Sequence, residues 1–155
     1  PSGNQYVFGV YTSNITIYNF GETASNTLTN SGSYDAFLVK YSSAGVLIWS
    51  TRIASANLEY TYMPSADSNG NVYVTGRYEG TCTFYNVGGG IATTLSNITA
   101  PDVFIAKYTT NGQLIWATRI GGTGADYEGA LASDLRGDVY VAGFYQSSPL
   151  AFYGV

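Results

Sequence analysis

The run Asp102-Val-Phe-Ile-Ala-Lys-Tyr108, Thr109-Thr-Asn-Gly112, Gln113-Leu-Ile-Trp-Ala-Thr-Arg-Ile120 decides the fold. Its first and last segments are rich in β-forming residues that alternate between two faces, which predicts two strands. The Asn-Gly pair between them supplies the positive φ angles that a tight hairpin needs. Because no stretch of the chain has a useful helical period, the sequence predicts an all-β protein.

The residues that follow predict two more strands. Gly121-Gly-Thr-Gly124 ends the second strand and lets the chain cross over. Glu128–Asp134 is predicted as a third strand of small residues, Leu135–Asp138 as a second turn, and Val139–Tyr145 as the fourth strand. The sequence therefore predicts a unit of four short antiparallel strands.

The same unit occurs again 67 residues earlier. Two units of 67 residues leave 21 of the 155, and the start of the chain is a third, partial copy. The copies are predicted to cover residues 1–60 (partial), 61–127 and 128–155 (partial) of one propeller segment that spans 1–155. A period of this length indicates supersecondary units stacked side by side. The matching positions include Gly9/Gly76/Gly143, Asp35/Asp102, Lys40/Lys107, Trp49/Trp116 and Asp67/Asp134.

Four antiparallel strands per unit are typical of a β-propeller blade. A flat β-solenoid is the competing geometry, but its coils usually have shorter periods, and the repeated hairpin turns favour the propeller. The small-residue strand fits the inner edge of a blade, and the strand with Trp49 or Trp116 fits the outer edge. An extra hairpin is expected between the fourth strand of one unit and the first strand of the next. We therefore expect about two blades and a partial third.

These residues together resemble the SBBP repeat, the "β-propeller repeat" of large secreted and surface proteins. The resemblance covers nearly the whole chain, and it implies a propeller, commonly of seven blades, with a binding or structural role and no shared catalytic residue. The first copy departs from the pattern at Ala54–Asn57, where Gly-Gly is missing, so a different path is expected there. The residues that carry it are Asp102, Phe104, Lys107, Tyr108, Gly112, Leu114, Trp116, Gly121, Gly122, Asp134, Gly137, Val139, Tyr140, Val141 and Gly143.

Charge is scarce in this chain. Only 10% of the residues are charged, the net charge is −4, and six residues are basic. Nucleic acid and anionic membrane surfaces need clustered Lys and Arg, so neither is an expected partner. No apolar run approaches the roughly 18 residues that span a bilayer. A surface made of Thr, Ser, Asn, Gly and Tyr suits a protein outside the cell or on the surface of a cell or particle.

Residue types that carry catalysis are few. His is absent, which removes the usual general base and most zinc sites. Cys82 is interpreted as a small apolar residue and Gly88–Gly90 as a flexible turn. Asp67–Asn71 faintly resembles a calcium loop but lacks the terminal Glu, and a hairpin turn is favoured. No cofactor, metal or catalytic residue is predicted.

Ten of the sixteen charged residues recur between copies with their sign kept. Paired carboxylates could do acid–base work, but a catalytic site rarely repeats in every blade. The prediction is therefore a set of ion pairs that fixes the register within and between blades. The pairs of positions are Asp35/Asp102, Lys40/Lys107, Arg52/Arg119, Glu59/Asp126 and Asp67/Asp134.

Aromatic and asparagine residues provide the remaining site hypotheses. Trp49 and Trp116 are predicted as core residues whose truncation costs about 3–5 kcal/mol each. Four tyrosines are candidates for a ligand platform on the surface: Tyr34, Tyr60, Tyr62 and Tyr127. Two asparagines match the acceptor pattern for N-glycosylation, which matters in a secretory context: Asn14 and Asn97.

The function expected from the sequence is a non-enzymatic structural or adhesive propeller module, and the alternative is a lectin-like carbohydrate-binding module. The expected partners are neighbouring blades of the same or identical chains, and glycans in the lectin-like alternative. The chain is expected to be a segment of a longer polypeptide or a subunit of a head-to-tail assembly. The longer polypeptide is favoured because head-to-tail joining would leave two equivalent strands competing for one place.

Overall fold

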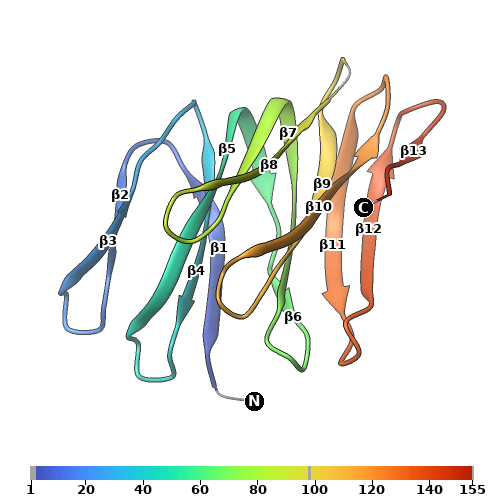
Figure 1. Cartoon of the computed structure of the whole chain (residues 1–155). Coiled ribbons are helices and arrows are strands. Elements are labelled where there is room, and N and C mark those ends of the chain that lie inside the picture. The colour runs from blue at the N-terminus through green and yellow to red at the C-terminus, as the bar shows by residue number, and fades with distance from the viewer. Residues whose placement is uncertain (1–2, 98, 155) are drawn as a thin grey trace.

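The computed structural model describes residues 3–97 and 99–154, without the side chains of residues 56, 58 and 59. Every regular element in these residues is a β-strand, which confirms the all-β prediction (Figure 1). The strands are β1 (Gln5–Tyr11), β2 (Ile15–Tyr18), β3 (Ala24–Leu28), β4 (Asp35–Tyr41), β5 (Leu47–Thr61), β6 (Ser65–Ala66), β7 (Val72–Tyr85), β8 (Ile91–Ser96), β9 (Asp102–Tyr108), β10 (Leu114–Gly121), β11 (Asp126–Ser133), β12 (Val139–Tyr145) and β13 (Ala151–Phe152).

The strands form three successive blades. Blade 1 consists of β1, β4 and residues 47–55 of β5, and blade 2 consists of residues 57–61 of β5, β6, residues 72–79 of β7, β9 and β10. Blade 3 is represented by β11 and β12. Hydrogen bonds between β5 and β7 join blades 1 and 2 into one sheet, whose strand order is β1-β4-β5-β7-β9-β10-β13. In Figure 1 the blades follow one another from blue to red across the molecule.

The β-turns within the blades have the expected positions but a different backbone geometry. Only the glycine of each turn has a positive φ, at Gly45, Gly70, Gly112 and Gly137. The sequence predicts a two-residue Asn-Gly turn with two positive φ angles. The structure instead has a longer turn closed by Gly112 N–H to Thr109 O (2.9 Å) and Thr109 N–H to Gln113 O (2.8 Å), followed by a register shift in β10.

The extra hairpin predicted between the fourth strand of one unit and the first strand of the next is present, and in the structure those two strands pair within one blade, β1 with β4 and β7 with β9. β2 pairs with β3, and residues 81–85 of β7 pair with β8. We call these the first and second connecting hairpins. The second hairpin pairs with the outer strand of blade 1, Ile53 opposite Phe84, while its own chain continues into blade 2. A connecting hairpin therefore ties one blade to the next.

The two copies differ where Gly-Gly is missing from the first. β5 runs without a break from blade 1 into blade 2, with register shifts between Ser55 and Asn57 and between Leu58 and Tyr60. In the second copy β10 ends at Gly121 and β11 begins at Asp126. A Cβ on Gly121 would lie 2.0 Å from Asp102 Oδ1, so only glycine fits beside that carboxylate.

The core lies between the blades rather than within any one of them. One cluster joins residues of blade 1 to the facing residues of blade 2, and a smaller cluster joins the opposite face of blade 2 to blade 3. The first contains Ala36, Leu38, Trp49, Ile53, Val72, Val74, Tyr78, Cys82, Phe84, Phe104, Ala106 and Tyr108. The second is built on Val103, Ile105 and Ile120, with Trp116, Leu131, Val141, Tyr145 and Leu150 packed against them.

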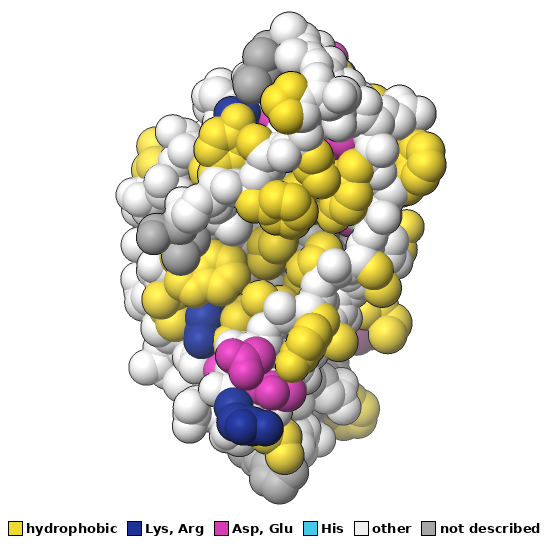
Figure 2. Space-filling view, turned by 90° about the vertical axis from the view of Figure 1, so that its right-hand side faces the viewer, with side chains coloured by type: hydrophobic (Ala, Val, Ile, Leu, Met, Phe, Trp, Pro, Cys, Tyr) yellow, Lys and Arg dark blue, Asp and Glu magenta, His cyan; other side chains and the backbone are white. Residues whose placement is uncertain are grey.

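Equivalent positions on the middle blade and the last blade differ in burial. Tyr73 on blade 2 is 0% exposed because it faces blade 3, whereas Tyr140, its equivalent on blade 3, is 62% exposed. Phe144 on the same face is 63% exposed. Figure 2 shows hydrophobic side chains gathered on this side of the molecule. This outward face of blade 3 has the pattern of a blade-to-blade contact surface.

The two tryptophans, predicted to be equivalent, also differ. Trp49 is 5% exposed, packs against Tyr6 with ring centroids 6.0 Å apart, and is covered by the turn of blade 2. Trp116 is half-buried, because it packs against Tyr73 at 6.2 Å without an equivalent turn over it. The sequence prediction of equal cost for truncation is therefore revised.

We expect Trp49→Ala to lower the free energy of unfolding by about 3–5 kcal/mol, as for other large core truncations. Trp116→Ala, the matched variant at the equivalent position, should cost clearly less, because part of its ring is already in water. Urea unfolding of both variants and the parent measures the difference. Equal losses would contradict the structural difference between the two positions.

Candidate functional site

One hollow lies at the turn end of the joint between blades 1 and 2. It has a volume of about 710 Å³ and is open to solvent. Its lining comes from the segment before β1, from β1, β4 and β6, from two turns of blade 2 and from the turn between β11 and β12. The residues are Gly3, Asn4, Tyr6, Lys40, Ala66, Asp67, Ser68, Asn69, Gly70, Thr110 and Leu135. We call this the joint hollow.

Thr110 is the centre of the joint beside this hollow. Lys40 Nζ donates to Thr110 O (2.8 Å) and to Thr110 Oγ1 (2.6 Å), and Trp49 Nε1 donates to the same carbonyl at 2.9 Å. Lys40 is only 4% exposed, and its Nζ lies 5.3 Å from the centroid of the Tyr6 ring. One turn of blade 2 therefore accepts hydrogen bonds from two buried side chains of blade 1.

The equivalent lysine of blade 2 has different partners. Lys107 Nζ lies 3.7 Å from Asp67 Oδ2 and 4.8 Å from the centroid of the Tyr73 ring. Asp67 belongs to the turn between β6 and β7, so this ion pair lies within blade 2. Tyr73 Oη donates to Gly137 O at 2.7 Å, as Tyr6 Oη donates to Gly70 O at 2.7 Å. Each tyrosine thus holds the turn of the next blade.

The Asp67 carboxylate is held by its own turn. Burial opposes its ionisation, but hydrogen bonds from the side chain and backbone of Asn71, from the Asn69 amide, and the charge of Lys107 lower the pKa of Asp67 overall. Hydrogen bonding to Tyr73, with the Asp67 charge, raises the pKa of Lys107 against the effect of burial. Both oxygens of Asp67 already accept hydrogen bonds, which fits the hairpin turn favoured over a calcium loop.

Two of the repeated charge positions form equivalent ion pairs. Arg52 lies 3.3 Å from Asp35, and Arg119 lies 3.3 Å from Asp102, with the same atoms in contact. Burial raises the pKa of both carboxyl groups in spite of their arginines. The ion pairs do not fully offset the loss of water around the carboxylates.

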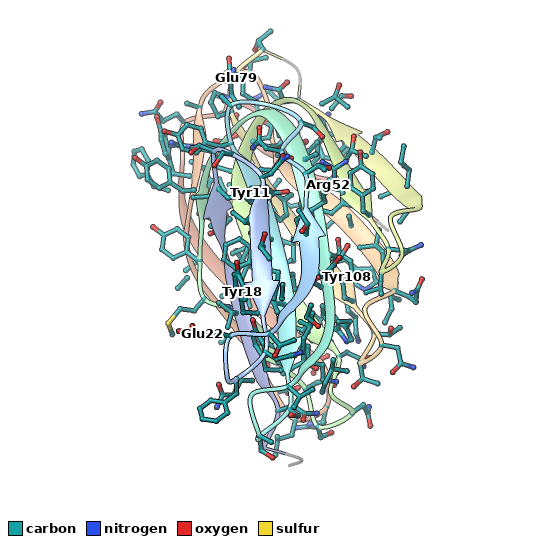
Figure 3. The ribbon with its side chains drawn as sticks, turned by 90° about the vertical axis from the view of Figure 1, so that its left-hand side faces the viewer. Tyr11, Tyr18, Glu22, Arg52, Glu79 and Tyr108 are labelled. Carbon is teal, nitrogen blue, oxygen red and sulfur yellow. The ribbon has the colours of Figure 1, made fainter. Side chains whose placement is uncertain are left out.

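The arginines also reach the connecting hairpins. Arg52 donates to Thr29 O (2.6 Å) and stacks over the Tyr85 ring at 4.3 Å. Arg119 donates to Ser96 O and stacks over Tyr153 at 3.9 Å. Figure 3 shows Arg52 and Tyr11 beside the first connecting hairpin, where Tyr11 Oη donates to Thr29 O at 3.0 Å. These ion pairs link blade strands to connecting hairpins.

The last repeated charge position is described in only one copy. Glu59 lies outside the residues whose side chains the structure describes. Asp126, its equivalent, is fully buried and accepts from the amides of Gln146 and Ser147 and from Ser147 Oγ at 2.6 Å. This carboxylate orders the chain that leaves β12.

A second, polar hollow of about 420 Å³ lies between the two connecting hairpins, over the outer strand of blade 1. We call it the rim groove. Asn26 Nδ2 donates to Ser50 Oγ at 2.6 Å and Thr51 Oγ1 donates to Tyr85 O at 2.7 Å, so part of the lining is already hydrogen-bonded. The lining is Asn26, Thr27, Leu28, Thr29, Ser50, Thr51, Arg52, Tyr85, Asn86, Gly88 and Gly89.

Two of the four tyrosines proposed as a ligand platform contact the same arginine. Arg77 Cζ lies 5.0 Å from the centroid of the Tyr60 ring and 4.5 Å from that of the Tyr127 ring. They are 67 residues apart and thus equivalent positions of the repeat, so their contact with one arginine places them at the joint of blades 2 and 3. Tyr34, Tyr60 and Tyr62 are exposed, and a ligand platform stays a prediction.

The two glycosylation candidates lie in connecting segments. Asn14 is exposed, and its Oδ1 accepts from the Asn30 amide at 2.9 Å. Asn97 is half-buried, and both ends of its amide are bonded: Oδ1 accepts from Gly80 N–H (3.0 Å) and Nδ2 donates to Ala100 O (2.7 Å). Ile98, the middle residue of that acceptor pattern, lies outside the described residues. Glycosylation of either residue stays a prediction.

Two residues of the joints were missed by sequence reasoning. Thr110 acts through its backbone carbonyl as well as its hydroxyl, and the only signal for it is a hydroxyl residue, Ser43, at the same place in the first copy. Arg77 breaks the repeat, because Val10 and Phe144 occupy the equivalent positions. A charge at one copy only could have identified it.

Two other kinds of site are absent from residues 3–97 and 99–154. In this part of the chain no three Cys, Asp or Glu side chains come close enough together to hold a metal ion. The same residues contain no helix with the length and apolar character required to cross a membrane.

Comparison with known proteins supports the β-propeller fold. It is 28% identical over 161 residues to an uncharacterized WD repeat-containing protein of Acanthamoeba polyphaga mimivirus. The match covers 99% of this chain and 11% of that protein, so the chain spans about a ninth of the relative's length. No family model matches the chain. With the strand order above, the chain consists of β-propeller blades, two of them followed by a partial third.

The buried carboxylates should respond oppositely to acid. Because folding lowers the pKa of Asp67, its contribution to stability is present above the unfolded value of about 3.9 and is lost as the pH falls through the folded value. Asp67→Asn should therefore be less stable than the parent at pH 7, and this deficit should shrink as the pH falls below about 4.

Asp102→Asn is the matched control, because burial raises the pKa of Asp102. The parent gains stability by protonating Asp102 as the pH falls through that raised value toward about 3.9, so the deficit of this variant should grow over that range. Urea unfolding at several pH values measures both trends. Parallel trends in the two variants would contradict the assignment.

Proposed function

We propose that this chain is a non-enzymatic structural or adhesive segment of a β-propeller of the SBBP type, in a secreted or surface-exposed protein. The observation that carries the proposal is the use of its ionisable groups. Arg52–Asp35 and Arg119–Asp102 repeat the same contact at 3.3 Å, and Lys107–Asp67 fixes a turn. These six ionisable groups are engaged in fixing strands, turns and connecting hairpins in place, which supports a scaffold.

The composition of the surface supports the place proposed for this scaffold. Charged residues make up 10% of the chain, so hydroxyl, amide and tyrosine groups carry most of its contact with water. Exposed aromatic and aliphatic side chains occur at several separate places, including Phe20, Ile91 and Phe152. Such a surface favours contact with other proteins or glycans over contact with polyanions.

A lectin-like carbohydrate-binding module is the second candidate, and the rim groove is the observation that favours it. The groove presents amide, hydroxyl and guanidinium groups beside the Tyr85 ring, within the volume range of small-molecule sites. Because Arg119 stacks on Tyr153 as Arg52 stacks on Tyr85, a site of this kind would recur once per unit.

Two measurements on the purified chain test these candidates. The scaffold proposal predicts no turnover in a screen of hydrolase substrates, and robust turnover abolished by a single Asp or Glu substitution would overturn it. The lectin-like alternative predicts saturable binding on a glycan array that is lost in Tyr85→Ala with Asn86→Ala. Binding unchanged in that variant would place the glycan outside the rim groove, and Tyr62→Ala is the matched control for an exposed tyrosine elsewhere.

A further inference from the structure

We propose that the open edge of β12, together with Lys107, Trp116 and Asp134, is the docking site for the first hairpin of a further repeat unit that follows in the same polypeptide. This inference rests on the proposed scaffold function and deepens it. The occupant is a hairpin equivalent to β9–β10, which begins with an aspartate and carries a lysine, a turn with a hydroxyl residue and a tryptophan strand. It would complete blade 3.

Lys40 and Lys107 occupy equivalent positions of the repeat, and each makes one of two kinds of contact. Lys40 donates to the Thr110 turn of the next blade, and no carboxylate forms an ion pair with it among the described residues. Lys107 has the carboxylate, Asp67, at 3.7 Å, but no turn of a next blade accepts from it within the described chain. When the two units are superposed by the 67-residue repeat, their contacts combine into a lysine that binds both a carboxylate of its own blade and a turn of the next strand pair.

The two tryptophans differ in whether a turn covers them. Trp49 Nε1 donates to Thr110 O at 2.9 Å, and the turn glycine Gly112 lies so close that an added Cβ would be 2.9 Å from the indole. Trp116 is half-buried, and within the described part of the chain its indole N–H makes no bond equivalent to that of Trp49. A turn placed over Trp116 would complete it in the same way.

The turn between β11 and β12 carries a carboxylate, Asp134, that a lysine would complement. Asp134 is the equivalent of Asp67, and its Oδ1 accepts the amides of Arg136, Gly137 and Asp138 as Asp67 accepts those of its own turn. Its nearest cation is the exposed Arg136, at 4.0 Å. A lysine on the docked strand would meet Asp134 where Lys107 meets Asp67.

The pairing of the fourth strands has the same register in blades 1 and 2. β1 pairs with β4, Gln5 opposite Tyr41, and β7 pairs with β9, Val72 opposite Tyr108. β12 is the equivalent of both fourth strands but pairs only with β11 in the described chain. Unpaired strand edges bind further strands readily. The docked strand would therefore pair with β12 in the register seen twice already.

The chain itself supplies the sequence for a test. Phe152 pairs with Ile120 as Phe84 pairs with Ile53, so Tyr153 matches Tyr85 and Val155 matches Val87. We would append a copy of residues 88–125 after Val155, with its tryptophan replaced by phenylalanine, and compare it with an appended segment of the same composition in scrambled order. The native-order extension should raise the folding equilibrium constant by about tenfold or more, because it adds buried hydrogen bonds and packing.

The decisive measurements are the fluorescence emission of Trp116 and the stability effects of replacing Trp116 or the appended lysine. In a Trp49→Phe background, Trp116 emission should shift to the blue with the native-order extension and stay unchanged with the scrambled one. Trp116→Phe should destabilise the extended chain as much as Trp49→Phe destabilises the parent, and should change the parent little. Replacing the appended lysine by methionine should cost the extended chain stability, and Asp134→Asn should cost nothing further in that variant.

Three results would overturn the inference. Trp116→Phe could have the same effect with and without the extension, or Trp116 emission could stay unchanged. Alternatively, Trp116 emission of the unextended chain could shift to the blue with rising protein concentration, which would make the occupant a second copy of the chain. None of these depends on enzymatic activity or glycan binding, so failure here is distinguishable from failure of the scaffold proposal.

Discussion

The structure depends on one constraint: a blade of this chain has two apolar faces and can bury neither by itself. Blade 2 shows the constraint satisfied, because Val74 and Tyr78 face blade 1 while Val103 and Ile105 face blade 3, all at least nine-tenths buried. Burial of apolar surface is the dominant favourable term in folding, and here nearly all of it is made between units. Stability must therefore decrease from the middle blade toward either end, where a face such as that of Tyr140 is open to water.

Buried charge has a different role in this architecture. Arg52–Asp35 and Arg119–Asp102 contribute little net stability, since burial raises the pKa of both carboxyl groups even beside a guanidinium. The ion pairs instead fix the position of the connecting hairpins, because each arginine also donates a hydrogen bond to one of them. Arg52 donates to Thr29 O, and Arg119 donates to Ser96 O. Asp67 is the contrasting case, in which the turn itself supplies enough donors to stabilise the charge. Carboxylates of the same repeat thus differ in cost according to the number of donors around them.

The sequence was sufficient for the positions of the repeated elements, though not for the backbone geometry of the turns. Strand positions, the turn glycines Gly45, Gly70, Gly112 and Gly137, the connecting hairpins and the outer place of the tryptophan strands follow from period and composition. It could not show which unit covers which residue. Trp49 and Trp116 have the same local sequence, and their difference in burial depends on a turn 61 residues from Trp49. Nor could it show that Tyr60 and Tyr127 contact one arginine, since Arg77 lies outside the repeat pattern.

The residues that form each joint come from two different units. In the joint of blades 1 and 2 the lysine and tryptophan come from one blade and the accepting turn from the next. At both joints a tyrosine of one blade donates to a turn of the next. Position 77 departs from that uniformity: it is Arg77 at the joint of blades 2 and 3, while the equivalent residues are Val10 and Phe144. Arg77 is buried and contacts the rings of Tyr60 and Tyr127, and a neighbouring blade with only aliphatic side chains there would not supply the Tyr127 contact. The repeated residues therefore hold the blades together, and the residue that does not repeat distinguishes one joint from another.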